Sequence, residues 1–321
     1  MAPGGWTEDG VHLWLAEQSF PKGLRGSRGH DAAVLHGLDG TPVLCSDQCI
    51  EGVHFPPGTA PRAAGRKAVL RTLSDLAASA CDPVAVTLNV RAPGATSEGS
   101  IRELILGAAE AAREHGAELV AGDLAMAEGD IGISVTAMGS LPADQTPVAR
   151  ELATPGQVVG VSGPLGGSFD GGRHLEPRPR FDAARTAVAA GATSMMDVSD
   201  GLAWDLYRLA RAAGVRVTIN LSSVPVHPDV DESLSGPGRL AHALHDGEDH
   251  ELLACWHPSA PLPLGWTVIG EVLDGSGLYL AGGEGPGEWD PTLTGGWRHG
   301  ENAPRPKGPK PKAPKPKANG R

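Results

Sequence analysis

The chain has 321 residues, with 38 Asp and Glu against 27 Lys and Arg, and its formal net charge is −11. Residues 301–321 carry seven basic side chains and one acidic one, a net of +6, which leaves residues 1–300 at −17. A body this acidic excludes nucleic-acid binding through counterion release. No apolar run of about 18 residues and no signal peptide are present, so we expect a cytoplasmic protein without a membrane span. The length suggests two domains of roughly 150 residues.

The seven lysines are distributed unevenly. Five lie in the C-terminal tail, and none lies between Lys67 and Lys307. The sequence has no GxxxxGK[ST] loop and no lysine placed like the strand lysine of protein kinases, which excludes these two classes of phosphate binder. If the ligands are phosphates, divalent metal ions and arginine remain to neutralise them. The four cysteines lack CxxC spacing and are expected to be reduced and mostly structural.

The first half of the chain alternates predicted helices and strands. In residues 66–80 the apolar side chains form one stripe at helical spacing. Asp75 falls on the opposite side together with Arg71, and a solvated helix face is the simplest interpretation of that side. Further helices are expected at residues 8–18 and 98–115, and strands at residues 31–36, 42–47, 84–90, 117–121 and 131–138.

A Pro/Thr/Ala-rich connection separates the two halves, and we place the domain boundary near Arg150. A strand at 157–161 then leads into a glycine-rich turn, Ser162 to Ser168, which either covers phosphates or simply reverses the chain. Helices are expected at 180–190, 200–213 and 238–245, and strands at 193–198, 215–220, 251–256 and 266–272. The pattern predicts an α/β fold with an N-terminal domain (1–149), a C-terminal domain (150–300) and an extended, disordered Pro/Lys tail (301–321).

Six short acidic segments recur along the chain, each with Gly, Ala or Ser beside the acid. They contain Asp31, Asp47, Asp75, Asp123, Asp197 with Asp200, and Glu248 with Asp249. Small neighbours allow a carboxylate to approach a ligand closely, and we interpret the six segments as turns that share one site. Mg²⁺ prefers oxygen ligands and is usually held by a few carboxylates plus substrate phosphates. The His and Cys residues lack the spacing of zinc ligands. The residue types would also allow glycosidase chemistry with two carboxylates, but that chemistry would not need six acids.

The order of these motifs resembles thiamine-monophosphate kinase, in the superfamily that includes aminoimidazole ribonucleotide synthetase. The resemblance runs from about Gly29 to His299. Its motifs are Gly29-His30-Asp31-Ala32-Ala33, Ser46-Asp47 through Gly52-Val53-His54-Phe55, Leu73-Ser74-Asp75-Leu76-Ala77-Ala78, Gly122-Asp123, Gly172-Arg173-His174-Leu175, Asp197-Val198-Ser199-Asp200-Gly201-Leu202 and Gly247-Glu248-Asp249-His250-Glu251-Leu252. Each motif is short, but their shared order makes the resemblance specific.

The resemblance implies ATP-dependent, magnesium-assisted phosphorylation of thiamine monophosphate to thiamine diphosphate. It also implies a homodimer formed through the sheets of the N-terminal domains. Several Mg²⁺ ions would be held by Asp31, Ser46, Asp47, Asp75, Asp123, Asp197 and Asp200. ATP would contact Gly122, Asp123, Arg150 and Ser199, and the thiamine part would contact His54, Glu248 and Trp297. Asp47, Asp75 and Arg150 would carry the catalysis.

The sequence departs from the family pattern near the expected phosphates. The departures are His30 beside Asp31, Cys45, Thr72, Leu124-Ala125 and His299-Gly300. They leave two alternatives open: a catalytically weakened homodimer that binds nucleotide or thiamine phosphate, and a relative that uses ATP on another small substrate. Simpler structural roles also remain open, namely a packed strand histidine for His54, a core cap for Trp297 and a linker surface charge for Arg150.

Overall fold

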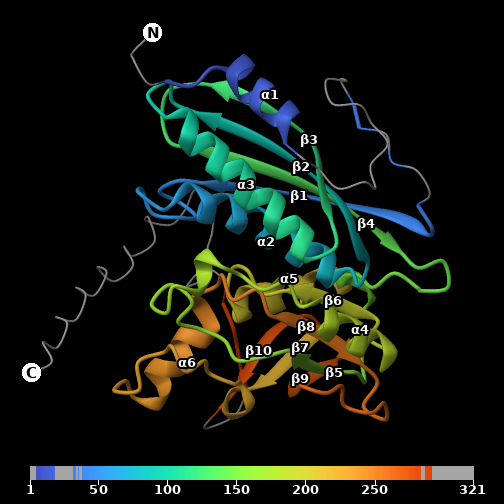
Figure 1. The fold of residues 1–321 in the computed structure, drawn as a ribbon. Helices are drawn as coiled ribbons and strands as arrows, with labels where there is room; N and C mark the ends of the chain where they lie inside the picture. The colour runs from blue at the N-terminus through green and yellow to red at the C-terminus, as the bar shows by residue number, and fades with distance from the viewer. Residues whose placement is uncertain (1–4, 19–31, 34, 36–37, 283–285, 291–321) are drawn as a thin grey trace, which may run out of the picture.

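The computed structural model describes residues 5–18, 32–33, 35, 38–282 and 286–290. Two α/β halves, each built on its own sheet, lie one above the other in Figure 1. The mixed α/β class expected from the sequence is confirmed. The four-stranded sheet comes from residues 41–141 and the seven-stranded sheet from residues 158–288, on either side of the predicted boundary near Arg150. Within the described ranges, no helix has the length and apolar character needed to cross a bilayer.

The first half has the strand order β1-β4-β2-β3, with helices on one face. Its elements are α1 (Glu8–Glu17), β1 (Thr41–Ile50), α2 (Pro61–Ala78), β2 (Asp82–Ala92), α3 (Glu98–Glu114), β3 (Glu118–Met126) and β4 (Gly132–Leu141). The hydroxyls of Thr7 and Ser97 accept hydrogen bonds from backbone N–H groups in the first turns of α1 and α3, and so cap both helices. Helix α2 begins at Pro61 rather than at residue 66, because proline is well suited to the first turn of a helix.

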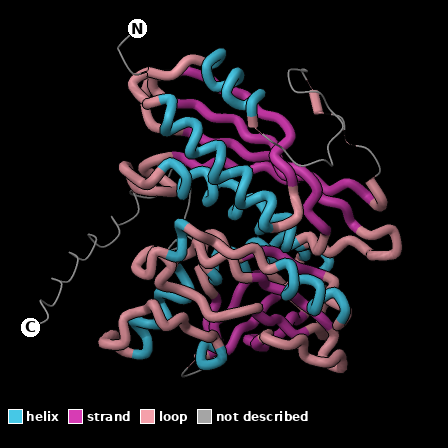
Figure 2. The backbone as a smooth tube through the Cα atoms, viewed as in Figure 1, coloured by secondary structure: helices cyan, strands magenta, loops and turns pink. Residues whose placement is uncertain are grey.

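Helices α2 and α3 pack closely side by side over the sheet, as the tube in Figure 2 shows. A Cβ atom on Gly65 would lie 2.0 Å from the carbonyl oxygen of Leu104, and one on Gly107 would lie 2.1 Å from that of Arg62. Only glycine fits at these two positions. Leu73, from α2, packs into the core between the helices and the sheet.

Helix α2 is buried on both sides. Its apolar stripe faces the core of the first half, while its polar side faces the second half, where the helix contacts β6. Arg71 on that side is 8% exposed, and Asp75 is half-buried. The solvated-face interpretation was therefore wrong, because it considered the helix without the half of the protein that covers it.

The second half has the strand order β11-β10-β7-β9-β5-β8-β6. Its helices and 3-10 turns are η1 (Arg150–Leu152), η2 (Arg173–Leu175), α4 (Phe181–Ala189), α5 (Leu202–Ala213), η3 (Leu221–Ser223) and α6 (Gly236–His245). Its strands are β5 (Val158–Val161), β6 (Ser194–Asp197), β7 (Arg216–Asn220), β8 (Leu252–Trp256), β9 (Thr267–Leu273), β10 (Gly277–Ala281) and β11 (Pro286–Glu288). Helix α5 packs its apolar face into the core of this half and ends before Gly214, whose φ of +67° is the left-handed conformation that glycine favours.

Three of the acidic segments are not turns. Asp47 lies inside β1, Asp75 inside α2, and Asp123 inside β3. Strands β1 and β3 continue past their predicted ends because neighbouring strands pair with them. In β1, for example, Ile50 lies opposite Gly132 of β4. Small residues are a weak local signal for a turn, and lateral hydrogen bonding overrides it. The strand expected at 31–36 is absent from its described positions, which are residues 32, 33 and 35.

Candidate functional site

Ser46 and Asp47, both predicted metal ligands, point to opposite faces of the four-stranded sheet. Successive side chains of a strand alternate in direction. On the side of α2, Asp47 Oδ2 accepts a hydrogen bond from Arg71 Nε at 3.0 Å. On the outer face, which we define as the face opposite α2 and α3, Ser46 Oγ lies 3.1 Å from Thr136 Oγ1. The structure therefore does not bring the two side chains to one point.

A polar row crosses the outer face and contains Asp123. The register places Gln48 opposite Ser134, Ser134 opposite Asn89, and Asn89 opposite Asp123, so the row spans all four strands. A cavity of about 340 Å³ is lined by these residues together with Arg91. Asp123 therefore lies on the other side of the sheet from Asp47.

Gly122 precedes Asp123 at a point of close strand contact. A Cβ atom here would lie 2.0 Å from the carbonyl oxygen of Leu88 on β2. The close spacing of β2 and β3 is therefore enough to require glycine at this position, whether or not Gly122 also contacts ATP.

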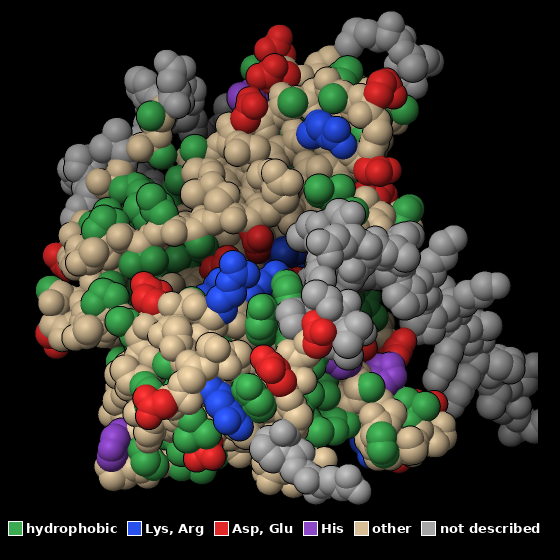
Figure 3. All heavy atoms as spheres, turned by 180° about the vertical axis from the view of Figure 1, so that it is seen from behind, with side chains coloured by type: hydrophobic (Ala, Val, Ile, Leu, Met, Phe, Trp, Pro, Cys, Tyr) green, Lys and Arg blue, Asp and Glu red, His purple; other side chains and the backbone are tan. Residues whose placement is uncertain are grey.

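A buried network of charged side chains joins the two halves. Lys67 Nζ lies 2.6 Å from Glu248 Oε2, and Arg71 Nη1 lies 3.7 Å from Glu248 Oε1. Arg71 also binds Asp47, so the network runs from β1 through α2 to the turn after α6. Seen from behind in Figure 3, acidic and basic side chains gather in the recess between the upper and lower halves.

The carboxylate of Asp197 belongs to the same region. Asp197 ends β6, is 4% exposed, and accepts a hydrogen bond from Ser74 Oγ at 2.7 Å. His250 Nδ1 lies 3.2 Å from the same oxygen, and His250 Nε2 lies 3.7 Å from Glu248. Three of the predicted ligand positions thus meet at the face of α2 that looks toward the second half: Asp47, Asp75 and Asp197.

The pKa values of these groups show how closely they interact. Burial raises the pKa of Asp75 to about 8, and the negative charges of Asp197 and Asp47 act in the same direction. Although burial opposes it, hydrogen bonding to Asp197 and Glu248 raises the pKa of His250 to about 9. Lys67 and His250 hold the pKa of Glu248 well below its ordinary value, against the effect of burial. A carboxyl that resists ionisation beside two other carboxylates is a place where a cation would be stabilised.

The turn after β6 is held by a buried carboxylate. Asp205 accepts hydrogen bonds from the backbone N–H groups of Ser199 at 3.0 Å and Asp200 at 2.9 Å. Arg208 bonds both Asp205 and Asp200, so the predicted metal ligand Asp200 already has a cationic partner. Burial and the charge of Asp200 raise the pKa of Asp205 to about 7.

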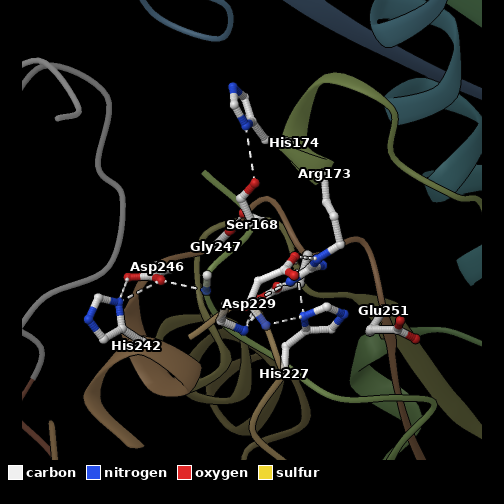
Figure 4. Close-up of polar contacts among 12 residues, drawn as sticks. Ser168, Arg173, His174, His227, Asp229, His242, Asp246, Gly247 and Glu251 are labelled. Carbon is white, nitrogen blue, oxygen red and sulfur yellow. Dashed lines mark hydrogen bonds and ion pairs between the residues drawn. The ribbon is translucent and has the colours of Figure 1, made fainter. Parts of the chain in front are cut away.

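The glycine-rich turn has its donors occupied by carboxylates. Gly166 N donates to both oxygens of Asp249, at 3.0 and 3.1 Å, and Gly167 N donates to Asp246 at 2.8 Å. Figure 4 shows Asp246 close to this turn. Backbone N–H groups of this kind are the ones that bind phosphates in other proteins. Here protein carboxylates use them, which favours the chain-reversal interpretation.

Comparisons with known proteins identify the family. Residues 29–141 match the family described as AIR synthase related protein, N-terminal domain. The thiamine-monophosphate kinase of Mycobacterium tuberculosis is 35% identical over 289 residues, which are 84% of each chain. That of Rhodopirellula baltica is 31% identical over 292 residues, which are 82% of this chain and 91% of the relative.

This chain belongs to the thiamine-monophosphate kinase family. It is accordingly an enzyme of the phosphotransferase class.

Solved structures of thiamine-monophosphate kinases share the fold. The enzyme from Stenotrophomonas maltophilia matches with a TM-score of 0.71 and 28% identity, over 85% of this chain and 95% of that chain. AaThiL complexed with AMPPCP and TMP matches with a TM-score of 0.70 and 28% identity, over 80% and 87%. Escherichia coli HypE, at 20% identity and a TM-score of 0.68, shares the fold alone.

The predicted substrate contacts Arg150, Ser199 and His54 lie on three different segments of the chain. Arg150 begins η1 with an exposed side chain, and its carbonyl accepts a hydrogen bond from Ser194 at the start of β6. Ser199 follows the end of β6, so Arg150 and Ser199 lie at opposite ends of that strand. His54 is 4% exposed, and its Nδ1 accepts a hydrogen bond from Ile50 N at 3.0 Å. Asp31 and Trp297 fall outside the described residues.

Three cationic residues of the network were not predicted from the sequence of this kinase. Lys67, Arg71 and His250 all lie at the junction of the halves. Lys67 is the only lysine in the part of the chain that is described. A lone lysine within the helix predicted at residues 66–80 was the signal that could have found it. Its partner lies 181 positions further along the chain, where no local pattern points to it.

Proposed function

We propose that this enzyme transfers the γ-phosphoryl group of ATP to the phosphate of thiamine monophosphate and so forms thiamine diphosphate. The observation that carries the proposal is that Asp47, Asp75 and Asp197 lie on the side of α2 that faces the second half, near enough for the charges of Asp47 and Asp197 to raise the pKa of Asp75. Membership of the kinase family supports the reaction, and the relative complexed with AMPPCP and TMP supports the two substrates.

Magnesium fits the donor set at this junction. Carboxylate oxygens are the ligands that Mg²⁺ prefers, and it usually takes only one or two of them together with substrate phosphates and water. Among the residues with a described placement, no group of three His, Cys, Asp or Glu side chains is arranged to hold a metal ion by itself, so the proposed ion would also need substrate phosphates as ligands. We propose that Asp47, Asp75 and Asp197 hold Mg²⁺, and when bound it would supply charge neutralisation for the phosphates.

We also propose that the remaining predicted metal ligands bind Mg²⁺. Asp31, Ser46, Asp123 and Asp200 would join further Mg²⁺ ions. Arg208 would have to leave Asp200 for this, because it now pairs with that carboxylate.

The chemical step needs little from the protein beyond positioning. The attacking atom is a phosphate oxygen whose second pKa is near 6, so it is largely deprotonated at neutral pH and requires no general base. What remains is to align two anionic groups and to stabilise the charge that spreads over the transferring phosphoryl group. Lys67 holds Glu248 and Arg71 holds Asp47 in place for this task through ion pairs.

Substrate contacts remain part of the proposal. Gly122, Asp123, Arg150 and Ser199 would contact ATP, and His54 and Trp297 the thiamine part. Glu248 was expected beside the thiazolium, but it is 3% exposed and paired with Lys67. This pairing favours a role in holding the site together.

We expect the full-length protein to release ADP and form thiamine diphosphate when it is given ATP, Mg²⁺ and thiamine monophosphate. Chelation of the metal with EDTA should stop turnover, and added Mg²⁺ should restore it, because the phosphate charges are then neutralised again. Coupled ADP release and chromatography of the thiamine phosphates measure the two products. ADP release with a different acceptor, and none with thiamine monophosphate, would identify a relative with another substrate.

A catalytically weakened homodimer is a second candidate, and one observation favours it. Arg71 pairs with Asp47 and Arg208 pairs with Asp200, so cations of the protein already occupy two predicted magnesium ligands. Tight binding of ATP without any turnover would support this candidate over the kinase.

We also propose that two copies pair through their outer faces. Leu44 lies on this face of β1 and is 67% exposed, so pairing of the two faces would remove its apolar side chain from water. Sedimentation velocity should give twice the 33.0 kDa chain mass, and Leu44→Lys should shift the protein toward monomer because it places a charge in the interface. A monomeric wild-type protein at micromolar concentration would contradict the pairing.

A further inference from the structure

Lys67 is the most deeply buried charged side chain of the junction. It is 0% exposed, and its ammonium group has two partners, Glu248 Oε2 at 2.6 Å and the carbonyl oxygen of His174. An ammonium group loses its hydration when it is buried, and it is retained in the interior only where partners compensate. The two partners lie on different segments of the second half, η2 and the turn at 247–251, so Lys67 ties both segments to α2 of the first half.

The turn at 247–251 has a backbone that needs such support. Glu248 and His250 adopt φ values of +57° and +51°, in the left-handed region that side chains other than glycine rarely enter. Conformations of this kind persist where the surrounding contacts determine them. The salt bridge from Lys67 to Glu248 is one such contact.

This turn is bonded directly to the turn that follows β6. Glu248 N donates to Ser199 O at 2.8 Å, and His250 N donates to Val198 O at 2.8 Å. The imidazole of His250 in turn contacts Asp197. The position of Asp197, a proposed magnesium ligand, therefore depends on the turn that Lys67 anchors.

A second connection runs to the other half of the carboxylate set. Glu248 also attracts Arg71, at 3.7 Å, and Arg71 orients Asp47 through a hydrogen bond of 3.0 Å. One ion pair, Lys67 with Glu248, thus lies between the elements that carry Asp47 and Asp197.

We propose that Lys67 is a positioning residue of the phosphoryl-transfer site. It fixes Glu248 and the turn at 247–251 against α2, and through them it aligns Asp197 and Asp47, which come from opposite halves of the protein. Because Lys67 is fully buried, we expect it to touch neither substrate. This inference rests on the proposed kinase function for its catalytic meaning, whereas its structural content can be measured without turnover.

The decisive comparison uses Lys67→Met, Glu248→Gln and the double variant. Methionine keeps much of the side-chain length without the charge, and glutamine keeps the shape of glutamate. Each single change removes one member of the closest buried ion pair and leaves the opposite charge less compensated, so both should lower the thermal midpoint. The double variant removes both charges, and its thermal midpoint should return toward that of the wild type.

Activity should not follow stability in this series. We expect kcat to fall by about 10- to 100-fold in all three variants, the usual loss when a residue that orients metal ligands is removed. KM for thiamine monophosphate should change much less, because the substrate contacts remain. A merely structural ion pair would instead give a double variant that recovers kcat together with its thermal midpoint, and this result would overturn the proposal.

Hydrogen exchange provides a measurement that does not require activity. The amides of Glu248 and His250 should exchange at least about tenfold faster in the double variant than in the wild type, because local opening costs less once the anchor is lost. Unchanged exchange at both amides would overturn the proposal even if the wild type proved inactive with thiamine monophosphate. An inactive wild type with faster exchange in the variant would contradict only the kinase function.

Arg62→Met is the matched control. Arg62 lies on the same helix and also forms ion pairs, but its side chain is 43% exposed and its partners, Glu103 and Glu110, lie on α3 of the same half. Its loss should leave kcat and the exchange of the turn within about twofold of the wild type, since exposed ion pairs contribute little.

Discussion

Asp47→Asn should lower kcat by more than about 100-fold while the fold stays intact. The loss should exceed that for residues which only orient metal ligands, because Asp47 is proposed to hold Mg²⁺ directly. Asparagine keeps an oxygen that can accept the hydrogen bond from Arg71 Nε, now at 3.0 Å from Asp47 Oδ2. Because this hydrogen bond is kept and Arg71 also lies 3.7 Å from Glu248, the buried guanidinium retains a carboxylate partner, and the fold should stay intact. The thermal midpoint and coupled ADP release measure the two quantities separately.

Asp82→Asn is the control for this substitution. Asp82 begins β2 and pairs with Arg185, and both side chains are more than half exposed. The same chemical change should leave activity near the wild-type value there, because an exposed pair is well screened by solvent. An Asp47→Asn variant that is as active as Asp82→Asn would refute the proposed metal site.

Gly65→Ala should destabilise the protein, against the prediction of helix propensity. Alanine is favoured over glycine in a helix by about 1 kcal/mol, so propensity alone predicts a gain. The added Cβ would lie 2.0 Å from the carbonyl oxygen of Leu104, which belongs to the backbone of α3 and cannot rotate away. Separation of α2 from α3 would follow, at a cost of about 1–3 kcal/mol or more. Urea unfolding and the thermal midpoint test this sign.

Gly99→Ala isolates the steric effect. Gly99 lies in α3, and its nearest neighbour for an added Cβ is Ser97 Oγ at 3.9 Å, an ordinary contact distance. We expect no loss of stability there and a gain of up to about 1 kcal/mol. If Gly65→Ala also stabilises the protein, the close packing of α2 on α3 is not as the structure has it.

Local sequence signals determined most of the helices and strands. The hydroxyls of Thr7 and Ser97 cap α1 and α3 from within a few residues of where each helix begins, because they satisfy N–H groups that a helix leaves unpaired. The order of the short acidic motifs pointed to the family that the comparisons show. These features are encoded within a few residues of one another, so they can be read without the fold.

The directions in which side chains point from helices and strands could be read only from the structure. The sequence predicted Asp47 and Asp123 at turns, where a side chain is free to point in many directions. Inside strands the direction is set by the pleat and by the register with neighbours, and Asp123 therefore points to the outer face while Asp47 points toward α2. The expectation of a single convergence of all acidic residues is not met within one chain among the residues described.

The partners of the charges were decided by tertiary structure alone. The scarcity of lysine was visible in the sequence, and it directed attention to metal ions and arginine. Lys67 nevertheless lies at the centre of the junction, paired with a carboxylate 181 residues away. The sequence by itself determined which charges the protein has and the local elements that carry them. Which charges meet, and how far burial strengthens each pair, depends on how two halves of the chain close around α2, because electrostatic energy follows distance and solvent exposure in space.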